Sequence, residues 1–189
     1  MIIAICGMDG SGKTTLAQKL LSQLRKKGLP AEFFHGHTYA VSSDSGGLKP
    51  AQVKKLSGLF RFLLPLAYCD NIFTYFFRYR PRARRRILIL DRYFYDKVAR
   101  MLYFGICGKT LAKLYARSLP RPELVFFLDA PEDVVYARKK EYEYDKLQIF
   151  RRAYLCLAPV INARVIDTTA PVEETAAAIF EDIRAYDRK

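Results

Sequence analysis

A glycine-rich run near the start of the chain narrows the folds that the rest of it can adopt. The run is Gly7-Met8-Asp9-Gly10-Ser11-Gly12-Lys13-Thr14, which matches the pattern G-x-x-x-x-G-K-[ST] in full. A β-branched stretch at residues 2–6 precedes it, and leucines at helical spacing follow it. The glycines let the backbone curl so that its N–H groups converge on phosphate oxygens at the positive end of a helix dipole. The sequence therefore predicts a strand, a phosphate-binding loop and a helix, in that order.

This loop is typical of proteins that bind ATP. We expect Lys13 to reach the β- and γ-phosphates and the hydroxyl of Thr14 to complete a Mg²⁺ shell. A chance glycine-rich turn is the alternative, and the strand and helix on either side count against it. The residues expected to bind the nucleotide are Gly7, Met8, Asp9, Gly10, Ser11, Gly12, Lys13, Thr14 and Thr15.

Short apolar runs alternate with longer helical patterns along the chain. The predicted strands are residues 2–6, 31–34, 87–90, 124–128 and 164–166. The third and fourth are continuously apolar, as in parallel strands covered on both faces. One predicted helix ends at Gly28 and Pro30, and another carries Val172 and Ile183. The fold class is therefore α/β: one P-loop NTPase domain over residues 1–189, with a mainly parallel five-stranded sheet flanked by helices on both faces.

Asp91 and Arg92 directly follow the predicted strand at residues 87–90. The carboxyl ends of strands face the ligand crevice in a doubly wound sheet, so we expect Asp91 to join Thr14 at Mg²⁺, directly or through water. Arg92 can form a two-pronged hydrogen bond with a phosphate. A helix-capping Asp and a surface Arg are the alternative, which the phosphate-binding loop makes less attractive.

Charge and cysteine usage restrict the setting of the protein. Lys and Arg number 32 against 19 Asp and Glu, a net charge of +13 that favours phosphates, nucleic acid or an acidic membrane as partners. The four cysteines form no C-x-x-C pair, which favours a reducing compartment over a disulfide framework or zinc site. Asp9 and Lys13 arrive too early for a signal peptide, so we expect a cytoplasmic protein.

Three segments together resemble the thymidylate kinase family of nucleoside monophosphate kinases. They are residues 6–15, the triplet Asp91-Arg92-Tyr93 and residues 121–129, and the resemblance runs nearly end to end. It implies ATP-dependent phosphoryl transfer to a phosphorylated small molecule, dTMP first. It further implies that Asp9 contacts the sugar and phosphate region of the acceptor and that Arg92 holds the acceptor phosphate. The implied catalytic residues are Lys13, Asp91, Arg92 and Arg138.

The resemblance also implies a lid at about residues 138–146. Arg138, Lys139 and Lys140 are its available cations, and one of them is expected to stabilise charge on the transferring phosphoryl. A solvated helix end is an equally good interpretation of each cation taken singly.

The acceptor pocket departs from the family pattern. The segment that corresponds to the family's base-reading Ala-Asp-Arg is Cys69-Asp70-Asn71, with Asn in place of Arg. Phe73 and Phe60 are candidates to stack on the base, although aromatics at helical spacing more often belong to the core. We expect dTMP to be a mediocre substrate, improved by Asn71→Arg unless Arg78 or Arg80 reaches the pocket. A nucleoside or a sugar- or glycan-related metabolite is the alternative acceptor.

Two further features remain open. The run Arg78-Tyr79-Arg80-Pro81-Arg82-Ala83-Arg84-Arg85-Arg86 is either a solvated connection or a contact for nucleic acid or an acidic bilayer, as in a nucleotide-dependent binding module. His35 and His37 flank Gly36, where they either touch the acceptor or belong to a solvated loop.

The apolar stretch at residues 59–77 is interrupted by polar residues, so it predicts a mostly buried helix rather than a membrane span. A homodimer is compatible with the sequence.

Overall fold

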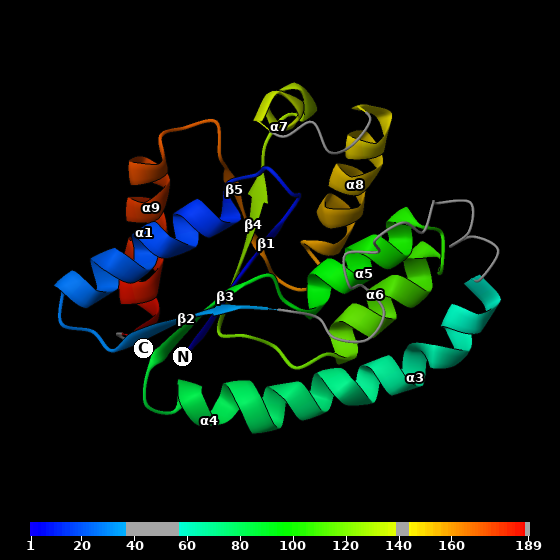
Figure 1. Cartoon of the computed structure of the whole chain (residues 1–189), viewed down its shortest axis with the longest axis horizontal. Coiled ribbons are helices and arrows are strands. Elements are labelled where there is room, and N and C mark those ends of the chain that lie inside the picture. Colours follow the sequence, from blue (N-terminus) through cyan, green and yellow to red (C-terminus); the bar gives the residue numbers. More distant parts are fainter. Residues whose placement is uncertain (37–56, 139–143, 188–189) are drawn as a thin grey trace.

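A five-stranded sheet organises the protein. The computed structural model describes residues 1–36, 57–138 and 144–187 (Figure 1). All neighbouring strands are parallel, in the order β2-β3-β1-β4-β5. The strands are β1 (Ile2–Gly7), β2 (Ala31–His35), β3 (Ile87–Asp91), β4 (Leu124–Asp129) and β5 (Arg164–Asp167). The predicted α/β class and the five predicted strands are confirmed.

Helices cover both faces of this sheet, as expected. The helices are α1 (Lys13–Lys26), α3 (Ser57–Phe73), the π-helix η1 (Thr74–Tyr79), α4 (Arg80–Ala83), α5 (Phe94–Tyr103), α6 (Lys109–Ser118), α7 (Glu132–Arg138), α8 (Tyr144–Leu157) and α9 (Val172–Asp187). In Figure 1, α1 and α9 lie on one side of the sheet, and α5, α6 and α8 lie on the other. No helix in the described part of the chain is long and apolar enough to cross a membrane.

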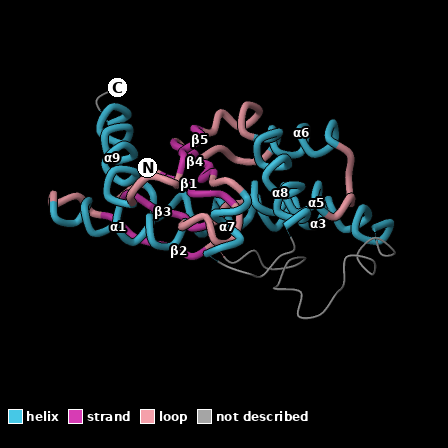
Figure 2. The backbone as a smooth tube through the Cα atoms, turned by 90° about the horizontal axis from the view of Figure 1, so that it is seen from above, coloured by secondary structure: helices cyan, strands magenta, loops and turns pink. Residues whose placement is uncertain are grey.

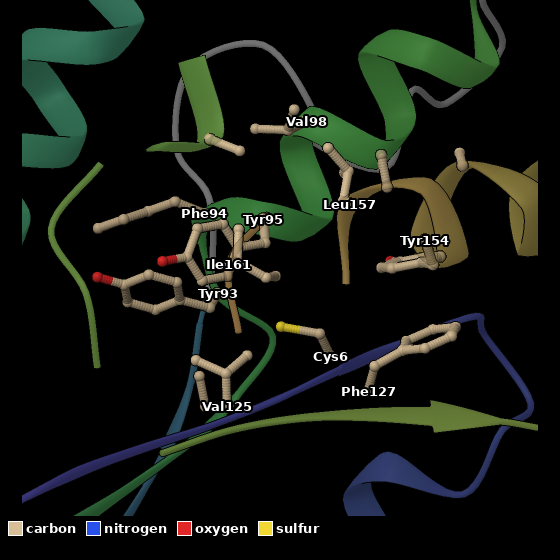
Figure 3. Close-up of a cluster of buried hydrophobic side chains, with 14 of the residues drawn as sticks. Cys6, Tyr93, Phe94, Tyr95, Val98, Val125, Phe127, Tyr154, Leu157 and Ile161 are labelled. Carbon is tan, nitrogen blue, oxygen red and sulfur yellow. The ribbon is translucent and has the colours of Figure 1, made fainter. Parts of the chain in front are cut away.

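Two buried clusters explain why β1 is apolar throughout. Ile3 and Ile5 point toward α1 and α9, whereas Ala4 and Cys6 point toward α5 and α8. The second cluster is rich in aromatic rings, and Figure 3 shows Tyr93, Phe127 and Tyr154 among them. Because β1 is covered on both faces, its carboxyl end is held firmly where the glycine-rich loop begins.

The apolar stretch at residues 59–77 is helical, but the prediction that it is mostly buried is wrong for its described side chains. α3, η1 and α4 form one continuous helix along an edge of the molecule (Figures 1 and 2). Tyr75 and Tyr79 pack against the core, whereas Phe62 is 83% and Phe77 69% exposed. Hydrophobicity alone predicted burial, while the helix in fact has one buried and one exposed apolar face.

Several residues that the sequence predicts to bind ligands or take part in catalysis lie at the carboxyl ends of the strands. Asp91 lies in register between Ile5 of β1 and His35 of β2, and Asp129 of β4 lies beside Asp167 of β5. The glycine-rich loop leaves β1 at the same edge and enters α1. Residues that are distant in the sequence therefore meet at one edge of the sheet.

Candidate active site

The glycine-rich loop has the backbone of a phosphate cradle. Gly7, Gly10 and Gly12 have φ values of 148°, 92° and 86°, a region that side chains rarely adopt. A Cβ at Gly7 would also lie 2.8 Å from the carbonyl oxygen of Leu128. The amide of Ser11 donates to the carbonyl of Met8 over 3.1 Å, which closes the turn before α1. The glycines are therefore required by geometry at these positions.

Lys13 lies inside this loop, and only 5% of the residue is exposed. Its ammonium donates to the Met8 carbonyl over 2.6 Å and lies 3.6 Å from the Asp9 carboxylate. Burial lowers the pKa of Lys13, and the charge of Asp9 opposes that shift. The loop thus holds a cation at the place where the sequence predicts phosphate binding.

Thr14 and Asp91 meet as predicted. The Thr14 hydroxyl donates to Asp91 Oδ2 over 2.6 Å, and His35 Nδ1 lies 3.1 Å from the same oxygen. Asp91 is fully buried, and its other oxygen, Oδ1, has no hydrogen-bond partner among the described residues. Burying a carboxylate oxygen without a hydrogen-bond partner costs free energy. This oxygen is therefore suited to coordinate Mg²⁺ or to accept a hydrogen bond from a water bound to Mg²⁺.

A cavity of about 450 Å³ opens over the loop. Its walls come from the loop, the start of α1, the end of α7 and the segment after β5. Arg138 lines it and donates to the carbonyl of Thr168 over 3.0 Å. The space is concave, borders a loop of backbone amides and carries the cations Lys13, Arg92 and Arg138, which suits a polyphosphate.

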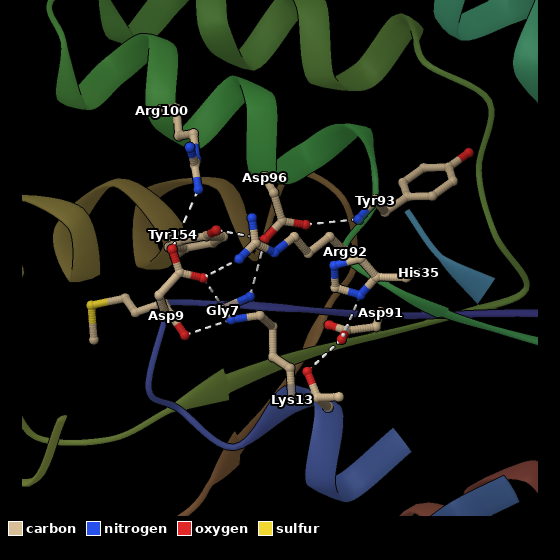
Figure 4. Close-up of polar contacts among 12 residues, drawn as sticks. Gly7, Asp9, Lys13, His35, Asp91, Arg92, Tyr93, Asp96, Arg100 and Tyr154 are labelled. Carbon is tan, nitrogen blue, oxygen red and sulfur yellow. Dashed lines mark hydrogen bonds and ion pairs between the residues drawn. The ribbon is translucent and has the colours of Figure 1, made fainter. Parts of the chain in front are cut away.

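Asp9 organises two arginines on the other side of the loop. Arg92 Nη2 donates to Asp9 Oδ1 over 2.5 Å, and Arg100 Nη2 donates to Asp9 Oδ2 over 3.3 Å (Figure 4). Both arginines border a second space of about 20 Å³, near the volume of one water, together with Phe150. Arg100 is a residue that the sequence analysis missed, because only the packing of α5 brings it to Asp9.

The backbone of Arg92 is in the left-handed region, with φ of 74°. Gly36, which follows β2, packs directly against it: a Cβ there would lie 2.4 Å from the Arg92 carbonyl oxygen. The Gly36 amide donates to the Asp91 carbonyl over 2.8 Å. This contact fixes the turn that carries Arg92 toward Asp9.

Asp96 joins three elements behind the site, and the sequence analysis missed it as well. Its carboxylate accepts from the amide of Tyr93 over 2.8 Å, the hydroxyl of Tyr154 over 2.6 Å and the amide of Gly7 over 3.3 Å. Burial, and then the charge of Asp96, raise the pKa of Tyr154 well above its usual value. Asp96 lies in the first turn of α5 and its carboxylate caps the amide of Tyr93, which precedes the helix; an acidic residue in a first helical turn was the available signal.

Asn71 and Phe73 lie apart from the two cavities. Asn71 is fully buried, donates to the Tyr115 hydroxyl over 3.3 Å and accepts from the Lys97 ammonium over 2.8 Å. Phe73 is 61% exposed and stacks on Phe77. Neither residue lines the spaces described above, so their predicted contact with the acceptor has no support from this geometry.

Part of the predicted site lies outside the described residues. Lys139 and Lys140 of the predicted lid do, as does His37. Of the segment 138–146, the structure describes Arg138 at the end of α7 and the first turn of α8. Phe60 lies in α3, but its side chain is outside the description.

Comparison with known proteins agrees with this geometry. A model of the thymidylate kinase family matches residues 5–179. The chain is 28% identical over 184 residues to a probable thymidylate kinase of Sulfurisphaera tokodaii, covering 91% of this chain and 90% of that protein. It is 31% identical over 203 residues to a thymidylate kinase of Xylella fastidiosa, covering 94% and 88%. A thymidylate kinase of Fervidobacterium nodosum is 27% identical over 205 residues, covering 98% and 100%. With its phosphate cradle, its Asp-Arg pair and this similarity along nearly the whole chain, the protein belongs to the thymidylate kinase family of nucleotide-binding phosphotransferases.

Proposed function

We propose that this protein transfers the γ-phosphoryl group of ATP to a nucleoside monophosphate, with dTMP as the first acceptor. The observation that carries the proposal is the 450 Å³ cavity over the glycine-rich loop, with the Asp9, Arg92 and Arg100 cluster at its side. A donor polyphosphate and an acceptor phosphate would thus bind next to each other. Such a reaction needs mainly positioning and neutralisation of charge.

On the donor side, the loop amides and Lys13 would hold the β- and γ-phosphates of ATP. Thr14 and Asp91 would hold Mg²⁺, and the unpartnered Asp91 Oδ1 supports this assignment. When bound, the metal supplies neutralisation of phosphate charge. A hydroxyl and a carboxylate are oxygen donors of the kind that Mg²⁺ takes, and phosphate oxygens and water would complete its shell.

On the acceptor side, Arg92 would bind the phosphate through its planar guanidinium. Asp9 aligns Arg92 by the 2.5 Å bond and holds Arg100 on its other oxygen. Arg138 lines the donor cavity and would stabilise charge on the phosphoryl in transit.

The test is an assay of ADP formation with ATP, Mg²⁺ and a panel of acceptors. The panel holds dTMP, other nucleoside monophosphates, nucleosides and sugar phosphates, because Asn71 stands where the family resemblance places an arginine. We expect Lys13→Ala to lower the rate at least about a hundredfold, the effect of losing one transition-state donor. Lys26→Ala, at the exposed end of the same helix, is the matched control.

The Arg92→Lys variant distinguishes a defect in acceptor binding from a defect in ATP binding. It replaces a two-pronged group by a point charge, so the KM for the acceptor should rise more than the Kd for ATP. Folded Lys13→Ala with wild-type activity, or an Arg92→Lys variant that loses only ATP affinity, would contradict the proposal. Turnover with a nucleoside or a sugar phosphate but with no nucleoside monophosphate would show that the proposed acceptor is wrong. The proposed ATP site would still stand.

A further inference from the structure

The last side chain of β2 reaches the carboxylate that we assign to the cation site. His35 of β2 lies in register beside Asp91 of β3. Paired residues of neighbouring strands project to the same face of a sheet, and His35 Nδ1 lies 3.1 Å from Asp91 Oδ2 (Figure 4). The sequence left open whether His35 touches the acceptor or belongs to a solvated loop. The structure gives it a partner on the donor side of the site.

The hydrogen bond between these two side chains has one direction. An ionised carboxylate only accepts hydrogen bonds, so His35 Nδ1 carries the hydrogen and donates it. Asp91 Oδ2 also accepts from the Thr14 hydroxyl over 2.6 Å. These two donors fill the acceptor positions of Oδ2, while the buried Oδ1 has no hydrogen-bond partner in the part of the chain that the structure describes. His35 and Thr14 together therefore decide which carboxylate oxygen remains for a cation.

The imidazole of His35 is not needed to hold β2 on the sheet. All five residues of β2 are in register with β3, and the Gly36 amide donates to the Asp91 carbonyl over 2.8 Å. The His35 side chain is 41% exposed, and a polar contact of so exposed a side chain contributes little to stability. Its partner Asp91 is fully buried. The contact therefore acts on the orientation of the carboxylate more than on the stability of the fold.

We propose that His35 is a positioning residue for Mg²⁺, because its hydrogen bond to Asp91 Oδ2 keeps Asp91 Oδ1 available for the cation that accompanies ATP. The role of His35 rests on the proposed assignment of Asp91 to the cation site. A hydrogen bond from Thr14 alone leaves the carboxylate able to twist about its Cβ–Cγ bond, and a second donor from another strand restricts that twist. Partners of this kind orient metal ligands and contribute about 10–100-fold to metal affinity.

The test measures the binding of Mn²⁺, a paramagnetic substitute for Mg²⁺, to the full chain with saturating ADP. The electron paramagnetic resonance signal of unbound Mn²⁺ gives the Kd without any turnover. His35→Asn keeps an N–H as many bonds from the backbone as Nδ1, whereas His35→Gln places it one bond farther away and His35→Ala removes it. We expect the Kd for Mn²⁺ to rise about 10–100-fold in the Gln and Ala variants and to stay within about threefold of wild type in the Asn variant.

Glu32→Gln is the matched control, because it removes another polar contact of β2. Glu32 pairs with Arg86 at 3.3 Å, toward the other end of the strand. This variant should bind Mn²⁺ like the wild type. All variants should bind ADP in the presence of EDTA like the wild type, since His35 does not line the cavity over the glycine-rich loop. Far-UV circular dichroism checks that every variant folds.

The proposal is overturned if His35→Ala binds Mn²⁺ like the wild type, or if the Asn and Gln variants weaken binding equally. Electron spin echo modulation from a protein nitrogen coordinated to Mn²⁺, lost in His35→Ala, would overturn it in favour of His35 as a direct ligand. A higher acceptor KM in His35→Ala with an unchanged Kd for Mn²⁺ would overturn it in favour of an acceptor contact.

Asp91→Asn distinguishes a failure of this proposal from a failure of the proposed function. If Asp91→Asn binds Mn²⁺ like the wild type, the assignment of Asp91 to the cation site and the role of His35 are both wrong. If Asp91→Asn weakens binding and His35→Ala does not, only the role of His35 is wrong. The expected Mn²⁺ pattern in a protein that phosphorylates no nucleoside monophosphate would support the role of His35 and refute the proposed acceptor.

Discussion

Replacing Asp96 by alanine is expected to lower the free energy of unfolding by about 4 kcal/mol, because three buried donors lose their acceptor. The donors are the amides of Gly7 and Tyr93 and the hydroxyl of Tyr154. Each donor left unpaired away from water costs about 1–3 kcal/mol, and such costs add incompletely. Asp96→Asn keeps one acceptor oxygen, so a smaller loss of about 2 kcal/mol follows.

Urea unfolding monitored by far-UV circular dichroism gives these values, since the chain has no tryptophan to report by fluorescence. Asp133→Asn, on the exposed first turn of α7, is the control and should change stability by less than about 0.5 kcal/mol. A folded Asp96→Ala variant within about 1 kcal/mol of wild type would refute the reasoning, because the three donors would then have other partners.

Three further measurements test whether the tyrosine, cysteine and asparagine side chains named below are buried as the structure shows. Burial raises the pKa of Tyr115 to about 12 and that of Tyr154 well above its usual value. Tyrosines in the unfolded chain ionise near pH 10, so the contribution of these two side chains to the free energy of unfolding, taken in urea as the difference from Tyr115→Phe and Tyr154→Phe, should be constant below about pH 10 and fall between about pH 10 and 12. A thiol reagent followed by mass spectrometry should modify exposed Cys69 first and Cys6 only on unfolding, because burial and then Asp96 raise the pKa of the Cys6 thiol; equal rates would contradict this. Asn71→Arg should destabilise the protein by at least about 2 kcal/mol instead of improving dTMP use, since the side chain is fully buried beside Lys97; a thermal melt unchanged from wild type would refute the placement of Asn71.

Local pattern was sufficient for the fold and for the donor loop. Short apolar runs identified all five strands, and the leucine stripe with Gly28 at its end identified α1. The glycines of the loop could be recognised from the sequence because the loop backbone needs positive φ values, which other residues rarely adopt. Asp91 was found because its position after a strand places it at the carboxyl edge of the sheet.

Contacts between residues that are distant in the sequence were not predicted. Arg100 reaches Asp9, 91 positions earlier, and Asp96 reaches Gly7, 89 positions earlier. Such pairs depend on how α5 packs on the sheet, which a local pattern does not contain. The exposed side of α3 escaped for a different reason: an apolar residue at helical spacing looks alike whether it meets the core or a partner outside the chain.

The contact between Gly36 and Arg92 has a consequence for how this protein can evolve. Any side chain at position 36 would collide with the carbonyl of Arg92, whose left-handed backbone already carries a penalty of about 1–2 kcal/mol. A substitution at Gly36 alone would therefore displace the turn that carries the guanidinium toward Asp9. The end of an outer strand and the turn that bears Arg92 thus constrain each other, although 55 residues separate them in the chain. Lineages that diverge in substrate would be expected to keep both or to rebuild both at once.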